Sequence, residues 1–195
     1  MLKPIVFVLL SLPFAWVVYA LFTGLLGANP IEAITHHTGE WALRILLLSL
    51  SMTPLRMILK TAWPIRLRRM VGLFAFFYVV THLLTYLVLD QQLDITAIWS
   101  DILERPYIVA GTVAFVIMIP LALTSTKGMM RRLGKRWQTL HKLVYVSAIA
   151  GVVHYIWLAK GDRIEPWFYL FVLFVLMLFR VKGFVVQLKK RKRER

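Results

Sequence analysis

Long uninterrupted apolar runs are the feature of this sequence that most restricts its fold. Several of them approach or exceed about eighteen residues, which is close to the length of a helix that crosses the hydrocarbon core of a bilayer. Their apolar residues are continuous and do not alternate with polar ones, so the pattern favours helices over strands. A helix also satisfies its own backbone polar groups in lipid. The sequence therefore predicts an all-α integral membrane protein.

Six membrane-spanning helices are expected, because prolines and charged clusters separate most of the apolar runs. With 59% hydrophobic residues and a mean hydropathy of +0.71, the 195-residue chain leaves no room for a soluble domain. The first run is too long for the core of a signal peptide, so we expect it to be retained. The predicted spans are residues 4–27, 38–59, 70–89, 107–126, 141–159 and 166–186.

Charged residues are divided unequally between the connections. Eight of the nine acidic residues lie near the connections after the first, third and fifth spans. Basic clusters follow the second and fourth spans and close the chain, at 56–69, 127–136 and 189–195. Short basic loops stay cytoplasmic, which predicts a six-transmembrane-helix bundle with both termini cytoplasmic.

The net charge of +15 is therefore interpreted as a topology signal and not as nucleic-acid binding. Residues 1–187 are expected to form the membrane domain, and residues 188–195 a basic cytoplasmic tail. Attraction of this tail to anionic membrane lipid is the simplest interpretation. Docking of a soluble cytoplasmic partner is the alternative.

Three histidines, His82, His141 and His154, lie inside predicted spans, where an ionisable side chain is costly and usually functional. His141 and His154 are thirteen residues apart on one predicted helix, which separates them by roughly 20 Å along its axis. The spans of His82 and His154 both run outward. These two side chains should therefore share a depth in the outer half of the membrane, while His141 lies at the inner edge.

Two imidazoles that face each other at one depth suit axial ligation of a haem iron. Hydrogen bonding between helices and proton relay are the alternatives for a histidine in a membrane, and His141 could simply be solvated. His36 and His37 precede the second span, so we expect both at the surface. A zinc site is disfavoured, because no third donor lies near His82 or His154 in sequence.

The chemistry available to the chain is restricted further by what the sequence lacks. There is no cysteine, which excludes disulfides, iron–sulfur clusters and covalent c-type haem attachment. Any haem must therefore be held non-covalently. Nucleotide-binding and nucleophile motifs are absent from the sequence, and no internal repeat is evident.

Several short motifs run in order along nearly the whole chain. They are ITHHTG (34–39), TPLR (53–56), RRMVGL (68–73), THLLTY (81–86), RPY (105–107), LALTST (121–126), LGKRWQTLH (133–141) and the pair His154–Tyr155. This series resembles the MsrQ family, formerly YedZ, which comprises the haem-binding membrane subunits of the bacterial periplasmic methionine sulfoxide reductase system. That family belongs to the ferric-reductase-like transmembrane group.

The resemblance implies a function as well as a fold. It implies b-type haem, an associated FMN and a place in the bacterial inner membrane. Electrons would come from the quinone pool or a cytoplasmic flavin reductase. They would pass to MsrP, a periplasmic molybdopterin-containing reductase, so the chain would relay electrons without being the catalytic reductase. His82, His141 and His154 match the family's haem histidines, and His36 matches another recurring histidine.

Two other functions stay open. The first is a ferric-reductase or oxidase type of electron carrier, and the second is a proton-coupled transporter that uses the histidines as relays.

One departure from the wider group concerns the inner histidine pair. The oxidases carry two histidines about thirteen residues apart on each of two helices, whereas the step back from His82 lands on Arg68 and Arg69. One haem is therefore supported by the ligand count, and a second would need another partner for His141. Arginine suits anions, so haem propionates or a flavin phosphate could be bound by Arg68, Arg69, Arg131 and Arg132.

Overall fold

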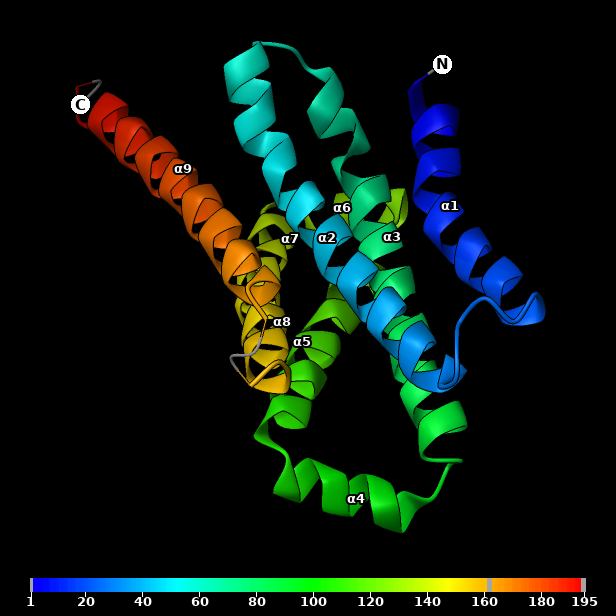
Figure 1. The fold of residues 1–195 in the computed structure, drawn as a ribbon. Helices are drawn as coiled ribbons and strands as arrows, with labels where there is room; N and C mark the ends of the chain where they lie inside the picture. The colour runs from blue at the N-terminus through cyan, green and yellow to red at the C-terminus, as the bar shows by residue number, and fades with distance from the viewer. Residues whose placement is uncertain (1, 161–162, 194–195) are drawn as a thin grey trace.

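The computed structural model describes residues 2–160 and 163–193, with residues 182–193 as helix backbone only. Every regular element within these residues is helical, which confirms the all-α prediction (Figure 1). The elements in chain order are α1 (Leu2–Phe22), α2 (Pro30–Leu59), α3 (Trp63–Leu84), the π-helix η1 (Thr85–Asp90), α4 (Ile95–Glu104), α5 (Pro106–Leu123), α6 (Lys127–Leu133), α7 (Lys135–Leu140), the 3₁₀-helix η2 (His141–Leu143), α8 (Val144–Leu158) and α9 (Glu165–Arg193).

Five helical segments are long and apolar enough to cross a membrane, so the chain is a multi-pass membrane protein. They are Leu2–Phe22, Pro30–Leu59, Trp63–Asp90, Pro106–Leu123 and Lys135–Leu158. The sixth predicted span falls on α9, whose side chains are described only as far as Val181. That span stays a prediction. The basic tail at 188–195 lies outside the described side chains.

Helix starts explain where the observed and predicted spans differ. α2 begins at Pro30, eight residues before the predicted span, because Asn29 caps it. The Asn29 side chain accepts a hydrogen bond of 3.3 Å from the Glu32 N–H, and proline suits the first helical position that follows. The predicted spans also omitted three short helices, α4, α6 and α7.

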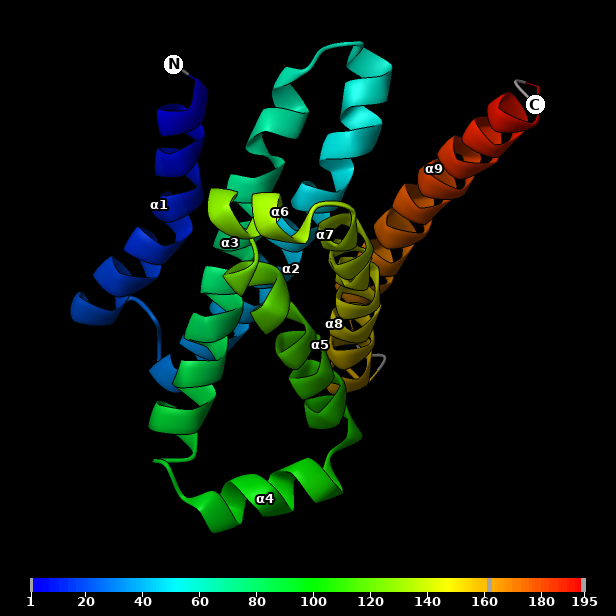
Figure 2. The same cartoon turned by 180° about the vertical axis from the view of Figure 1, so that it is seen from behind.

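Two helix pairs form the centre of the bundle. α2 packs along α3, and α5 packs along α8, while α1 lies against α2 and α3, and α9 against α2 and α8 (Figures 1 and 2). The core between them is apolar and closely packed. Its most deeply buried large side chains include Ile45, Leu50, Val71, Tyr78 and Val152.

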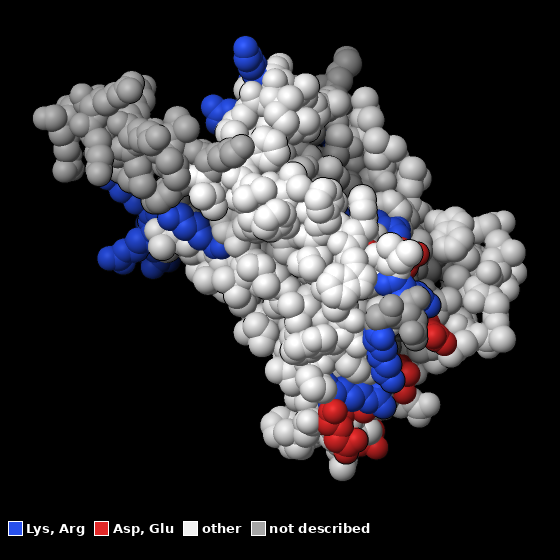
Figure 3. All heavy atoms as spheres, turned by 60° about the vertical axis from the view of Figure 1, so that its left-hand side comes forward, with Lys and Arg blue, Asp and Glu red and all other residues white. Residues whose placement is uncertain are grey.

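The connections sort to the two ends of the bundle as the charge pattern predicts. The start of α1, the α2–α3 connection and the end of α9 lie at one end, and α4 lies at the other (Figure 1). On the face drawn in Figure 3, acidic residues lie in the lower part of the view and along its right-hand side, with basic residues beside them. A cytoplasmic location for both termini stays a prediction.

A buried tyrosine attaches α1 to the rest of the bundle. The Tyr78 hydroxyl on α3 accepts a hydrogen bond of 2.9 Å from the Phe14 N–H and donates one of 2.8 Å to the Leu10 carbonyl. An α-helix would normally pair these two groups with each other. The hydroxyl bridges them beside Pro13, which lies inside α1. This insertion fixes α1 against α3 at the proline.

Candidate functional site

The structure brings His82 and His154 together. His82 lies near the end of α3 and His154 near the end of α8, and both helices lead towards the acidic end of the bundle. The ring centroids are 6.1 Å apart and the ring planes are inclined at 78°. Both side chains are half-buried within the chain. The expected match in depth between these two histidines is therefore present.

Each of these imidazoles is held by a main-chain carbonyl. His82 Nδ1 lies 2.9 Å from the Thr35 carbonyl oxygen on α2, and His154 Nδ1 lies 2.6 Å from the Tyr107 carbonyl oxygen on α5. A carbonyl only accepts, so Nδ1 must carry the proton in both rings. A neutral imidazole protonated at Nδ1 presents the lone pair of Nε2. This is the form in which histidine binds a metal, with its other nitrogen bonded to a fixed acceptor.

The separation of the rings fits a metal bound between them. A metal–imidazole bond is about 2 Å long, so two such bonds in line, with the distance from each nitrogen to its own ring centre, sum to about 6 Å. The observed 6.1 Å agrees with this value. Among the described side chains, no group of three histidine, cysteine, aspartate or glutamate residues could enclose a metal ion. Two protein ligands and a planar cofactor fit the pair better than a tetrahedral zinc site.

His141 lies elsewhere and in a different setting. His141 and His154 lie on one helical segment, Lys135–Leu158, as predicted, but His141 begins the 3₁₀ turn η2 between α7 and α8. Its ring stacks on Trp137 at 3.9 Å between centroids, and its Nδ1 lies 3.1 Å from the Trp137 carbonyl oxygen. The Ser125 hydroxyl lies 3.4 Å from its Nε2. No second histidine faces it among the described residues.

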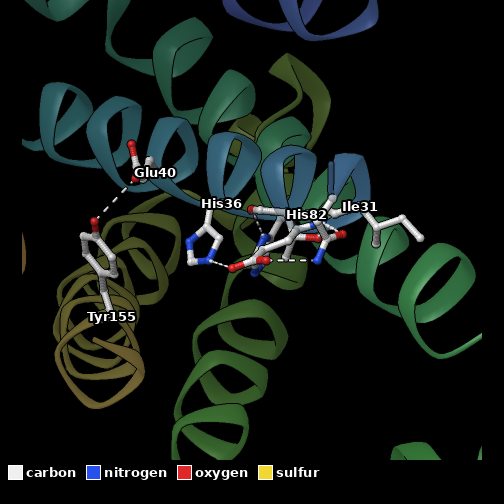
Figure 4. A network of polar contacts seen from close by, with 8 residues as sticks. Ile31, His36, Glu40, His82 and Tyr155 are labelled. Carbon is white, nitrogen blue, oxygen red and sulfur yellow. Dashed lines mark hydrogen bonds and ion pairs between the residues drawn. The ribbon is translucent and has the colours of Figure 1, made fainter. Parts of the chain in front are cut away.

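His36 and His37 are not the surface residues that the sequence predicts, because α2 begins before them and both are half-buried. His37 Nε2 donates a hydrogen bond of 2.9 Å to the Pro13 carbonyl, which ties α2 to α1. His36 Nε2 lies 3.7 Å from a carboxylate oxygen of Glu32, and Figure 4 shows this contact beside His82. His37 thus has a packing role, and His36 lies at the edge of the histidine pair.

The predicted anion-binding arginines occupy the opposite end of the bundle from α4. Arg69, Arg131 and Arg132 are exposed, and Arg68 is half-buried. An open hollow of about 420 Å³ is lined there by Lys127, Met130 and Arg131. The structure therefore brings a basic surface to this end, although it does not bring these arginines to the pair formed by His82 and His154.

Arg180 is a polar residue that the sequence analysis missed. Its guanidinium donates a hydrogen bond of 2.8 Å to the Thr53 hydroxyl on α2 and lies over the Tyr145 ring, 5.4 Å from the centroid. The signal was a single arginine inside the apolar run 166–186. A charged side chain within a membrane span is costly, so a lone arginine there indicates a specific polar partner even when no motif surrounds it.

A second polar cluster lies next to His154, towards the end of the bundle that carries α4. The Tyr155 hydroxyl lies 3.5 Å from carboxylate oxygens of both Glu40 and Glu165, and Figure 4 shows the contact with Glu40. Arg44 forms an ion pair with Glu40 at 2.7 Å and a hydrogen bond of 2.8 Å with the Tyr169 hydroxyl. These contacts join α2, α8 and α9 around the residue that follows His154.

Comparison with known proteins gives a consistent picture. A family model described as the ferric reductase like transmembrane component matches residues 38–152, which include His82 and His141. Three similar proteins are each named protein-methionine-sulfoxide reductase heme-binding subunit MsrQ. The one from Rhodospirillum rubrum is 51% identical, over 90% of this chain and 85% of its own length. Those from Herminiimonas arsenicoxydans and Azospira oryzae are 47% and 50% identical, over 93% and 92% of this chain and 84% and 78% of their own lengths.

Proposed function

The chain belongs to the ferric-reductase-like transmembrane family and, within it, to the MsrQ heme-binding subunits, and we propose that it is a b-type cytochrome. His82 and His154 would hold one haem between them, each through its Nε2. The observation that carries this proposal is the pair of imidazoles 6.1 Å apart, each with Nδ1 bonded to a main-chain carbonyl.

The protein's own groups prepare the two ligands. When bound, the haem supplies a one-electron carrier, which is chemistry that these side chains do not provide. The carbonyls of Thr35 and Tyr107 hold each ring in the tautomer that presents Nε2, and they raise the basicity of that nitrogen. Burial of the site among apolar helices limits water and so tunes the reduction potential.

The electron acceptor in this proposal is the catalytic partner of the chain, the periplasmic molybdopterin reductase MsrP, and the chain is not itself the catalytic reductase. The names of its relatives support this division, since each is described as the heme-binding subunit of a methionine sulfoxide reductase. The position of His82 and His154 supports it too. Both lie near the ends of helices that lead to the acidic connections, which are the predicted periplasmic ones.

The donor side lies at the opposite, basic end. There the chain receives electrons from the quinone pool or a cytoplasmic flavin reductase, and it binds FMN. The exposed Arg69, Arg131 and Arg132, the half-buried Arg68 and the hollow beside Arg131 support an anion-binding role. Guanidinium groups pair well with phosphates and carboxylates. His141 belongs to the cofactor-binding residues of this end.

The location follows from the same proposal. Residues 1–187 form the haem domain in the bacterial inner membrane, and residues 188–195 form a basic cytoplasmic tail. The apolar spans and the basic connections support this arrangement. The tail's positive charge is attracted to anionic lipid headgroups.

Single substitutions of the two histidines test the ligand assignment. The full-length protein and its His82→Ala and His154→Ala variants are purified in detergent, and haem per protein is measured with the absorption spectrum. Each variant should lose most of its haem, because one axial ligand and its ordered hydrogen bond are gone. His141→Ala should keep the haem that His82 and His154 hold.

His36→Ala is the matched control, because His36 is on α2 beside His82 and its ring contacts Glu32 only loosely, at 3.7 Å. It should retain the wild-type haem ratio. Full haem and unchanged bands in both His82→Ala and His154→Ala would refute the assignment. Absence of any haem band from the wild-type protein would instead favour a proton-coupled transporter.

A further inference from the structure

Two glycines stand directly against the two histidine rings. A Cβ added to Gly39 would lie 3.0 Å from both Cε1 and Nδ1 of His82. A Cβ added to Gly111 would lie 2.8 Å from Nδ1 and 3.1 Å from Cε1 of His154. Optimal contact between nonbonded carbon atoms is about 3.5–4.0 Å, so any side chain at either position would force the ring to move.

The two glycines belong to one arrangement that occurs twice. In each half, a carbonyl accepts the Nδ1 hydrogen bond, the glycine follows that carbonyl by four residues, and the histidine follows it by forty-seven. The members of the first set, Thr35, Gly39 and His82, each precede those of the second by seventy-two residues. The sequence pattern showed no repeat, so this correspondence comes from the structure alone.

The spacing of four has a physical reason. Residues four apart lie on the same face of an α-helix, so the carbonyl and the glycine face the same imidazole. In the helical ladder the carbonyl oxygen also accepts the N–H of the residue four positions later, which is the glycine itself. The oxygen has two lone pairs and can accept both hydrogen bonds. The ring can reach it only because no Cβ stands beside it.

From this repeated geometry we infer that Gly39 and Gly111 are positioning residues for the two haem ligands. Each missing Cβ lets the Nδ1–Cε1 edge of an imidazole lie close against the helix that carries its carbonyl acceptor. This contact fixes how the ring turns about its bond to Cβ, and therefore where Nε2 points. The inference rests on the proposed ligand role of His82 and His154. In this arrangement, the direction in which each Nε2 points is set by a helix other than the one that carries the histidine.

The distances predict an order of effects. The closer approach at Gly111 leaves the His154 ring less room than His82 has beside Gly39. Gly111→Ala should therefore disturb the site more than Gly39→Ala. Loss of a group that orients a metal ligand typically weakens metal binding by about 10–100-fold. We expect Gly111→Ala to release haem to apomyoglobin about tenfold faster than the wild-type protein does.

The experiment compares four single variants of the full-length haem protein. Gly39→Ala and Gly111→Ala are the test variants. Gly151→Ala and Gly128→Ala are the controls, because a Cβ at Gly151 would meet Leu43 at an ordinary 3.8 Å and one at Gly128 would meet nothing within 4 Å. The readouts are the rate of haem release and the low-spin ferric EPR spectrum, which reports the orientation of the axial imidazoles. A general loss of packing would not alter that spectrum in the test variants alone.

The test variants should shift the EPR signal and speed haem release, while both controls should match wild type. If Gly39→Ala and Gly111→Ala match the controls while His82→Ala and His154→Ala lose haem, the positioning role is wrong and the ligand assignment stands. If the histidine variants keep their haem, the proposed function itself is wrong.

A second measurement tests the inference if Gly111→Ala folds poorly. In a His154→Ala background the ring that opposes a Cβ at position 111 is gone, so adding Gly111→Ala should no longer lower the yield of folded protein or its melting temperature. An equal loss in both backgrounds would show that Gly111 is needed for another reason and would overturn the inference.

Discussion

The histidines of this chain differ in which ring nitrogen forms a hydrogen bond and in which element supplies the acceptor. His82 and His154 are bonded through Nδ1 to carbonyls on other helices. The Nδ1 of His141 instead faces a carbonyl within its own helical turn, at Trp137. His37 is engaged through Nε2, and its ring lies near Trp16 at 5.0 Å between centroids. Only the first two combine a fixed external acceptor with a neighbouring imidazole.

Tyr78 offers a test of how a single hydroxyl secures α1. Tyr78→Phe removes two hydrogen bonds, but it also frees the Phe14 N–H and the Leu10 carbonyl to pair with each other. The loss in unfolding free energy should therefore be only about 1 kcal/mol. Tyr78→Ala also empties a fully buried site and should cost about 3–5 kcal/mol.

The stability of both Tyr78 variants can be measured by unfolding in mixed detergent micelles, followed by circular dichroism. Tyr19→Phe is the control, because Tyr19 is also on α1 but is 60% exposed, and it should be neutral. A Tyr78→Phe cost as large as that of Tyr78→Ala would mean that the hydroxyl, and not the ring, holds α1.

At this scale the sequence identified the facing histidines but not what holds them. His82 and His154 could be paired because depth in a membrane follows from counting residues along a helix. The Thr35 and Tyr107 carbonyls could not be identified from the sequence, because every residue has a carbonyl and only packing decides which one contacts a ring. The same is true of Gly39 and Gly111, since a glycine in an apolar helix has many uses.

Among the helices, α4 stands apart in direction and in composition. It lies across the end of the bundle between α3 and α5, at a steep angle to the spans (Figures 1 and 2). Ile95, Trp99 and Leu103 follow one another at intervals of four, so they share a face, and all three are more than 60% exposed. On the other side, Asp101 pairs with Arg105 at 3.2 Å. Such a helix suits the boundary between lipid and water.

Spin labels can test whether the apolar face of α4 meets lipid. The chain has no cysteine, so Leu103→Cys and Glu104→Cys each give a single labelling site. In lipid bilayers, the label at 103 should collide more with dissolved oxygen, which concentrates in lipid, and the label at 104 more with a water-soluble nickel complex. Equal exposure of both labels to the nickel complex would place α4 in water.

Element boundaries show where sequence patterns stop being informative. α4 has ten residues, too few to be recognised by its apolar length. The interruption of α7–α8 at His141 has no proline or glycine to announce it, and the structure shows stacking of His141 on Trp137 there. The early start of α2, by contrast, was readable, because Asn29 followed by Pro30 is a helix-start signal that the apolar run obscured.

The orientation of the whole molecule in the membrane is a prediction from charge. A reporter enzyme fused after Gly128, or at the C-terminus, should be retained in the cytoplasm because lysine and arginine clusters adjoin those sites. A fusion after Gln92, in the turn before α4, should be exported. A periplasmic signal from the C-terminal fusion would overturn the predicted topology and reverse the direction of electron flow.

Figure 1 is consistent with both termini lying on one side of the membrane, since the start of α1 and the end of α9 lie at the same end of the bundle. The charge pattern predicts an orientation from sequence because it is a property of loops. Which helices lie side by side could not be deduced in the same way, since all the spans are similarly apolar. Specific contacts, such as those of Tyr78 and Arg180, fix that arrangement.

The repeated arrangement around the two histidines also bears on how the protein is made. His82 has its carbonyl and glycine on α2, the helix that precedes it in the same hairpin, and His154 has both on α5, its own hairpin partner. Each hairpin can therefore enter the membrane during synthesis with its imidazole already oriented. The second half need not be present for the first to be correct. Packing of the two hairpins against each other then brings the two oriented imidazoles to 6.1 Å between ring centroids.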